Sequence, residues 1–153
     1  MNSKESMKEQ LEILRGHLKR KGLKQTSQRE AILRIFWGLP DFLTVDELAG
    51  RVRQVDKRIG ASTVYRALKL FAEAGLAWEH RFWHGKTCFE RAKGGAPQNY
   101  LICTACGRVQ AFQDPLIDAV RDKVAGGLRF KPTFNRMEVY GLCSEHRGPE
   151  DDE

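Results

Sequence analysis

Apolar residues near the start of the chain recur at helical spacing. Met7, Leu11, Leu14 and Leu18 follow one another at steps of four, three and four, with lysines and arginines on the remaining faces. Because a helix places residues at these steps on one side, we predict an amphipathic helix that ends near Gly22.

Three more helices are predicted in the first half of the chain. Ser27 and Thr44 each stand three residues ahead of a glutamate, an arrangement that caps a helix start, and apolar residues follow both. Ser62 is expected to cap a longer helix that runs to a stop at Gly75.

A β-hairpin is predicted after these helices. Residues 76–82 and 86–90 are rich in aromatic side chains and flank a His84-Gly85 turn. Two short extended runs around a glycine turn are typical of a hairpin. Helices followed by a hairpin indicate a winged helix-turn-helix domain.

The second half is predicted to form a smaller α/β domain. Residues 92–97 have the Gly/Pro composition of a linker. Strands are expected over 100–103, 109–112 and 137–142, and Asp114-Pro115 is typical of a helix start. The expected fold class is therefore α+β. The predicted parts are a winged helix over residues 1–91, a hinge linker over 92–98, a second domain over 99–148 and an acidic tail over 149–153.

Positive charge is concentrated in the first half. Residues 1–91 carry 18 Lys and Arg against 11 Asp and Glu, whereas residues 92–153 carry 8 against 9. This asymmetry favours a polyanion such as nucleic acid as partner of the first half, although a solvated basic face would give the same counts. The charged start and the lack of a long apolar run lead us to expect a cytoplasmic protein with no membrane partner.

Three of the four cysteines are spaced for metal binding. Cys103-x-x-Cys106-Gly places two thiolates on a tight turn, and Cys143-x-x-His146 supplies two further donors for one tetrahedral zinc ion. Zinc would stabilise a domain too small for a large core. The alternatives are a cytosolic thiol redox protein using the Cys103/Cys106 pair, and a zinc-binding RNA or scaffold module. We expect no enzyme, because no nucleophile, base and orienting group occur together.

The start of the helix predicted from Ser62 can read DNA. In a helix-turn-helix the second helix enters the major groove with its first residues toward the base edges. Here these residues are Ser62, Thr63, Tyr65 and Arg66, whose side chains suit phosphates and bases. The alternative is an ordinary solvated helix start.

Several segments together resemble the ferric uptake regulator family of bacterial transcriptional regulators. They are Gly22-Leu23-Lys24, Thr26 to Arg29, Ser62-Thr63-Val64-Tyr65-Arg66-Ala67-Leu68 and Gly75-Leu76, and the similarity runs from about Leu11 to His146. The resemblance implies that Lys24 enters the minor groove and that Tyr65 and Arg66 meet the major groove and backbone. It further implies a phosphate contact for Arg29.

The same resemblance implies the assembly and the cofactor. A family member would be a homodimeric repressor that binds a palindromic, A/T-rich operator in double-stranded DNA. The second domain would be its dimerisation domain, with one structural zinc per chain. Relatives often close that site with a second C-x-x-C pair, whereas here His146 stands in place of the fourth cysteine.

The chain departs from the family at its second, regulatory metal. Relatives hold that metal largely through a His-rich run before the first cysteine pair, where this chain has Ala96-Pro97-Gln98-Asn99-Tyr100. Phe42 stands where a histidine is often found, and Asp118 and Asn135 stand where Glu and His serve in many relatives. Amides and a phenol are poor ligands for a divalent transition metal. The regulatory site is therefore expected to be degenerate or remodelled.

Glu90 alone is retained among those positions, and other donors lie near it on the predicted hairpin. His80, Cys88 and Glu90 are the candidates for a remodelled regulatory metal site. The alternative is that they are ordinary strand residues. In that case DNA binding would be independent of a second metal or would answer to another input.

Overall fold

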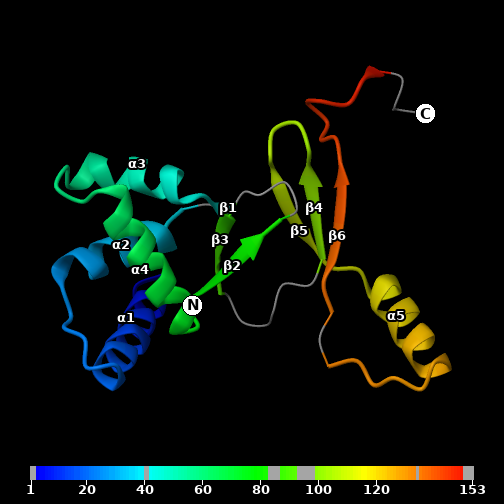
Figure 1. The fold of residues 1–153 in the computed structure, drawn as a ribbon, viewed down its shortest axis with the longest axis horizontal. Helices are drawn as coiled ribbons and strands as arrows, with labels where there is room; N and C mark the ends of the chain where they lie inside the picture. The colour runs from blue at the N-terminus through cyan, green and yellow to red at the C-terminus, as the bar shows by residue number, and fades with distance from the viewer. Residues whose placement is uncertain (1–2, 40–41, 83–86, 93–98, 134, 150–153) are drawn as a thin grey trace. The chain divides into compact units, whose positions relative to one another are not determined.

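The computed structural model describes residues 3–39, 42–82, 87–92, 99–133 and 135–149. The chain folds into two compact units, Met1–Gly94 (the first unit) and Gly95–Glu153 (the second unit). Each unit combines helix with a small sheet, so the fold class is α+β as predicted (Figure 1). None of the described helices has the length and apolar run that crossing a membrane requires.

Four helices make up most of the first unit, as predicted. They are α1 Ser3–Arg20, α2 Ser27–Trp37, α3 Val45–Val55 and α4 Ala61–Glu73. Leu11, Leu14 and Leu18 of the predicted stripe are at most 5% exposed. Helix α1 is followed by Gly22 and helix α4 by Gly75, both with positive φ, which glycine adopts without a steric cost.

The helix starts differ in detail from the prediction. The expected capping box at the start of α3 is present. Helix α2, however, is capped by Thr26, whose hydroxyl accepts a hydrogen bond from the Arg29 N–H, rather than by Ser27. Helix α4 follows Gly60, so Ser62 lies in its first turn with an exposed side chain instead of capping it.

The sheet of the first unit has the strand order β1-β3-β2, with antiparallel neighbours. Its strands are β1 Phe42–Leu43, β2 Ala77–Arg81 and β3 Thr87–Arg91. Strands β2 and β3 confirm the predicted hairpin, while the turn expected at His84-Gly85 lies outside the described residues. Strand β1 was not predicted, because two residues are too few to show an alternating pattern.

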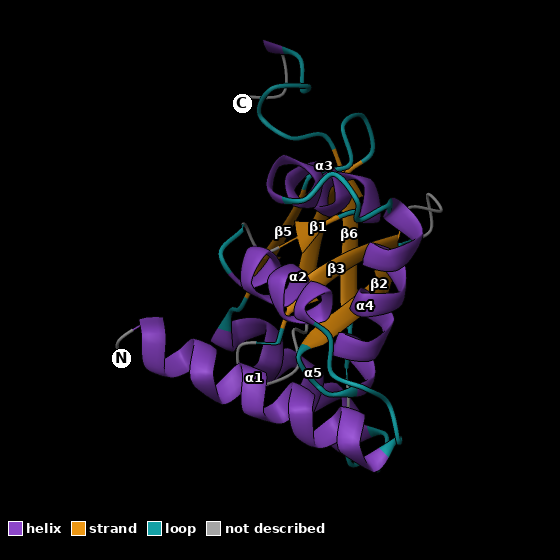
Figure 2. Ribbon diagram, turned by 90° about the vertical axis from the view of Figure 1, so that its left-hand side faces the viewer, coloured by secondary structure: helices purple, strands orange, loops and turns teal. Residues whose placement is uncertain are grey.

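The four helices lie on one side of this sheet (Figures 1 and 2). Ala77 and Phe89 of the strands belong to the same buried cluster as the apolar faces of the helices. Val64, Leu68 and Phe71 of α4 are fully buried in that cluster, as expected of core residues. Helix α4 is therefore fixed by its inner face, and its outer face is left for other contacts.

The second unit has a sheet of order β5-β4-β6 and one long helix. Strand β4 (Asn99–Cys103) pairs antiparallel with β5 (Val109–Phe112) and parallel with β6 (Met137–Gly141), confirming the three predicted strands. Parallel neighbours need a crossover connection, and helix α5 (Pro115–Gly127) provides it. Most of the predicted linker, residues 93–98, lies outside the described part of the chain.

Helix α5 starts as predicted and ends differently. The Asp114 carboxylate caps it by accepting the Leu116 N–H at 2.8 Å. The two glycines expected to close the helix remain helical, and the residue with positive φ after it is Arg129, at 60°. Figure 1 shows α5 beyond the end of the three strands, and none of its residues is buried.

Candidate functional site

Three sulfurs and one imidazole meet at one end of the second sheet. The register places Cys103, at the end of β4, opposite Gly141, at the end of β6. Because these strands are parallel, the segments that follow them leave the sheet at the same end. Gly107, with φ 75°, turns the chain back into β5 after Cys106, and its N–H donates to the Cys103 carbonyl at 2.9 Å.

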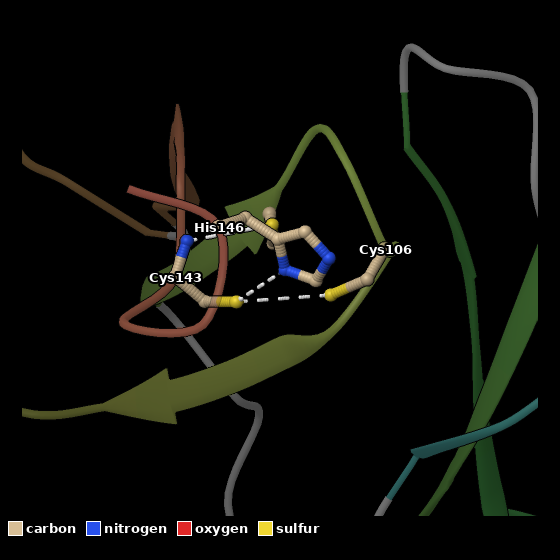
Figure 3. A group of neighbouring side chains, drawn as sticks. Cys106, Cys143 and His146 are labelled. Atoms are coloured by element: carbon tan, nitrogen blue, oxygen red, sulfur yellow. Dashed lines mark hydrogen bonds between the residues drawn. The ribbon is translucent and has the colours of Figure 1, made fainter. Parts of the chain in front are cut away.

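The spacing of the ligand atoms fits a metal ion. Those of Cys103, Cys106, Cys143 and His146 all lie within 4.8 Å of one another. The Sγ atoms of Cys106 and Cys143 are 3.8 Å apart, and Cys143 Sγ lies 3.1 Å from His146 Nδ1 (Figure 3). Two sulfurs bound to a tetrahedral zinc at about 2.3 Å lie about 3.8 Å apart. A disulfide requires about 2.05 Å, so Cys106 and Cys143 are not joined by one, and the convergence of four donors fits a metal centre.

The peptide groups around the site favour a charged Cys103. The N–H groups of Cys106 and then Cys143 lower the pKa of the Cys103 thiol to about 6, so this residue is a thiolate at neutral pH. The Arg108 N–H acts to lower the pKa of Cys106, but desolvation and the neighbouring sulfurs outweigh it and raise that pKa. A bound cation would supply the charge needed to ionise Cys106.

A surface ion pair also joins the two ligand-bearing segments. Arg108, which directly precedes β5, donates to the Glu145 carboxylate at 2.6 Å. Both side chains are more than half exposed, and such pairs contribute about 0–1 kcal/mol. The ion pair adds little to the backbone hydrogen bonds that already join these segments, such as the one from the Thr104 N–H to the Gly141 carbonyl, and a bound metal would fasten them further.

The predicted DNA-reading residues lie on the first turns of α4. Ser62, Tyr65 and Arg66 are exposed, and Thr63 is half-buried. The Arg66 guanidinium donates to the Thr63 hydroxyl at 3.4 Å. Val64 between them is fully buried and anchors this end of the helix. The structure therefore presents a hydroxyl, a phenol and a guanidinium side by side on a fixed backbone.

Two residues that were not singled out from the sequence, Lys69 and Glu79, extend the surface beside Tyr65. The Lys69 ammonium, one helical turn farther along, lies 6.0 Å from the centroid of the Tyr65 ring. It also donates to Glu79 of β2 at 2.7 Å, and this hydrogen bond holds the pKa of Glu79 below its ordinary value. The spacing of Tyr65 and Lys69 was a readable signal, since residues four apart are neighbours on a helix. The contact with Glu79 depends on the tertiary fold.

Lys24 and Arg29 are connected through the loop before α2. Lys24 is exposed and Arg29 is half-buried. The Arg29 guanidinium donates to the Lys24 carbonyl. Arg29 therefore shapes the loop that carries Lys24, in addition to the phosphate contact expected of it.

The three candidate regulatory ligands lie close together on the hairpin. His80 Nε2 is 2.9 Å from the Glu90 carboxylate, and Cys88 is the cross-strand partner of His80. The rings of Phe42 and Phe82 lie 5.8 and 5.7 Å from the His80 ring. Within the described part of the chain, the Cys103 cluster is the one group of three or more donors close enough to hold an ion. A metal at His80, Cys88 and Glu90 stays a prediction.

Asp118 and Asn135 are brought together by a residue that the sequence did not single out. The Arg121 guanidinium donates to Asp118 Oδ1 at 2.8 Å and to Asn135 Oδ1 at 2.8 Å. Its Nε donates to Asp122 Oδ1 at 2.9 Å. The pairing with Asp118 could have been expected from the i,i+3 spacing, but the contact with Asn135 follows from the fold.

Comparison with known proteins gives consistent results. The model of the ferric uptake regulator family matches residues 20–140. A ferric uptake regulation protein of Neisseria meningitidis serogroup B is 33% identical over 129 residues, which cover 84% of this chain and 89% of that protein.

Solved structures extend the likeness to the fold. The Helicobacter pylori ferric uptake regulator, described as having three functional metal-binding sites, matches with a TM-score of 0.83 and 27% identity over 91% of this chain and 92% of its own. The Vibrio cholerae ferric uptake regulator, described as showing a rearrangement of its DNA-binding domains, matches with a TM-score of 0.69 and 32% identity over 82% and 96%. The likeness in sequence and in fold covers most of this chain and most of each relative, and this protein belongs to the ferric uptake regulator family.

Proposed function

We propose that the protein is a homodimeric, sequence-specific DNA-binding repressor of the cytoplasm, with one structural zinc per chain. The observation that carries the proposal is the exposed set Ser62, Tyr65 and Arg66 on a helix anchored by buried Val64, in a member of this family. The proposed parts keep the boundaries expected from the sequence, with residues 1–91 reading DNA and 99–148 forming the dimer.

The side chains of α4 suit the major groove. Arg66 can donate to guanine or phosphate, Tyr65 can contact thymine methyl groups, and the hydroxyls of Ser62 and Thr63 can bond phosphates. Family resemblance assigns Lys24 to the minor groove and Arg29 to a phosphate. A narrow, A/T-rich minor groove attracts such a cation most strongly, which supports an A/T-rich operator.

The metal centre suits zinc. Three sulfurs and one imidazole form a soft, closed set of four donors, the pattern of structural zinc sites. Cys103, Cys106, Cys143 and His146 would hold the ion, which supplies folding free energy to the second unit. Among the described residues no second set of donors is grouped in this way.

The surface of α5 supports a homodimer. Leu116, Val120, Val124 and Leu128 recur at steps of four and are 53–70% exposed, and Phe130 beside them is 74% exposed. Contiguous apolar surface of this kind is uncommon on a monomer and marks an interaction site. A second copy of the chain would cover it around a two-fold axis, and a two-fold protein reads a palindromic operator.

Selection of duplexes from a random library by the purified full chain tests this function. Affinity for the selected duplex is expected to exceed that for a scrambled duplex by about a thousandfold or more, and to fall as salt rises. Equal affinity for both duplexes would refute sequence-specific binding.

A matched pair of variants locates the reading surface. Arg66→Ala should lower affinity for the selected duplex at least tenfold, since a good base or phosphate contact is worth about 1–3 kcal/mol. Lys123→Ala removes the same charge from the exposed side of α5 and should leave affinity unchanged. Equal losses in the two variants would show that only total charge matters.

A further inference from the structure

The site of Asp118 and Asn135 does not fit a divalent metal. Many relatives place regulatory ligands at these positions, but here both side-chain oxygens accept hydrogen bonds from Arg121 at 2.8 Å. The available set is one carboxylate, one neutral amide and one permanent cation. Amides are weak ligands for transition metals, and a guanidinium this close repels a dication.

We propose that the Arg121 guanidinium takes the place of a regulatory metal ion and makes dimerisation and DNA binding independent of one. Arg121 is thus a positioning residue: it links helix α5 to the segment before β6 through Asn135. The inference rests on the proposed function and deepens it, because it assigns the protein to constitutive rather than metal-gated binding.

The link acts on the surface that would form the dimer. Helix α5 has no buried residue, and its inner edge is only half-buried, at Ile117, Asp118, Arg121 and Ala125. With so little apolar packing, the hydrogen bond from the Arg121 guanidinium to Asn135, which leaves the helix, contributes to the orientation of α5, and the bonds to Asp118 and Asp122 fix the guanidinium on the helix. Arg121 and Asn135 also line the same groove as Val120 and Val124, so the link sets the direction of the apolar stripe.

A second guanidinium lies against the stretch that replaces the family's His-rich run. Tyr100, the last residue of that stretch, is fully buried, and Arg136 Cζ lies 5.2 Å from the centroid of its ring. Arg136 follows Asn135 directly and donates to Glu138 at 2.6 Å. An arginine side chain therefore lies at two of the places where this chain departs from the family's ligand pattern: Arg121 at Asp118 and Asn135, and Arg136 at Tyr100.

Permanence distinguishes a guanidinium from a metal. A bound dication dissociates when its concentration falls, whereas arginine remains attached and protonated at all physiological pH values. The neighbouring Asp122 carboxylate raises the pKa of Arg121 further. Neither metal supply nor pH in that range would release the link.

The proposal takes the alternative in which His80, Cys88 and Glu90 are ordinary strand residues, and metal titration of the intact zinc-loaded protein tests it. After removal of exchangeable ions, elemental analysis should find one zinc per chain, and Mn²⁺ or Fe²⁺ should neither add a second ion nor change affinity for the selected duplex. A gain of tenfold or more in affinity with either ion would overturn the proposal.

Variants test the role of Arg121 directly. Arg121→Ala should weaken both dimerisation and binding of the selected duplex about tenfold while keeping the structural zinc, because hydrogen bonds to charged groups are lost. The double variant Arg121→Ala with Asn135→His should take up a divalent ion and regain affinity when Zn²⁺ is added. Lys123→Ala, on the same helix, should match the original protein in every assay.

Retention of full dimer and duplex affinity by Arg121→Ala that carries its structural zinc and no added ion would overturn the proposal. If thermal unfolding shows that Arg121→Ala is not folded, Arg121→Lys replaces it in the dimer and duplex assays. The lysine variant keeps the charge but loses the forked geometry of the guanidinium. Its dimer should be weaker than that of the original protein, and an unchanged dimer would overturn the proposal as well. Dimer dissociation and ion counts need no duplex, so they separate failure of this proposal from failure of DNA binding.

Discussion

A single charge placed in the apolar stripe of α5 should separate the proposed dimer. The substitution is Val120→Glu, at the middle of the stripe. Since α5 contributes no buried residue to its own chain, the substituted monomer should fold as before. The effect should therefore fall on association alone.

The size of the effect follows from the exposure of the side chain. Val120 is 53% exposed, so covering it in a dimer is worth about 1 kcal/mol per chain. Burying a carboxylate there costs at least about 1–2 kcal/mol more. With two copies at a two-fold interface the total reaches about 4 kcal/mol, which raises the dissociation constant about a thousandfold.

Sedimentation velocity across a concentration series measures this constant. The control is Gly126→Glu, which makes the same change of charge on the opposite side of the same helix, where an added side chain meets nothing, and should leave the dimer intact. Zinc content and thermal unfolding confirm that both variants are folded. A Val120→Glu protein that remains dimeric at the concentrations where the original does would show that the stripe is not the interface.

Three further outcomes are expected. Cys106→Ser should lose the zinc, seen as less than about 0.1 ion per chain by elemental analysis, together with cooperative unfolding of the second unit. The neighbouring peptide groups hold the pKa of Cys103 at about 6, so this sulfur is a thiolate above that pH and is protonated below it. The affinity for zinc should therefore fall more steeply with decreasing pH below pH 6 than above it, as measured against a competing chelator. In binding titrations, Tyr65→Ala should reduce the ratio of the affinities for the selected and the scrambled duplex, whereas Lys24→Ala should lower both affinities more evenly.

Periodic and short-range features were predictable from the sequence. The apolar stripe through Leu11 and Leu14 predicted α1, and the spacing of Cys103 and Cys106 predicted two of the four metal ligands. Both predictions depend on residues that are close together in the chain. Pairing of those cysteines with Cys143 and His146 could be inferred from donor count, since four ligands close a zinc site.

Features decided by competition or by the tertiary fold were not predictable in this way. Thr26 and Ser27 can both cap a helix, and only the geometry of the chain entering α2 selects Thr26. Strand β1 exists because β3 offers it an edge, not because two residues favour extension. The Arg121 bridge to Asn135 joins residues on either side of the turn after α5, where no periodic pattern applies.

Because β4 and β6 are parallel, loss of the metal would affect the whole segment between the two pairs of ligands. Cys106 and Cys143, 37 positions apart, enclose β5, α5 and β6 in one loop that the ion closes. Withdrawal of the ion would return conformational freedom to the entire loop. The apolar stripe would then lose its fixed direction even though it touches no ligand, and chelation would register first as dissociation of subunits rather than as damage at the cysteines.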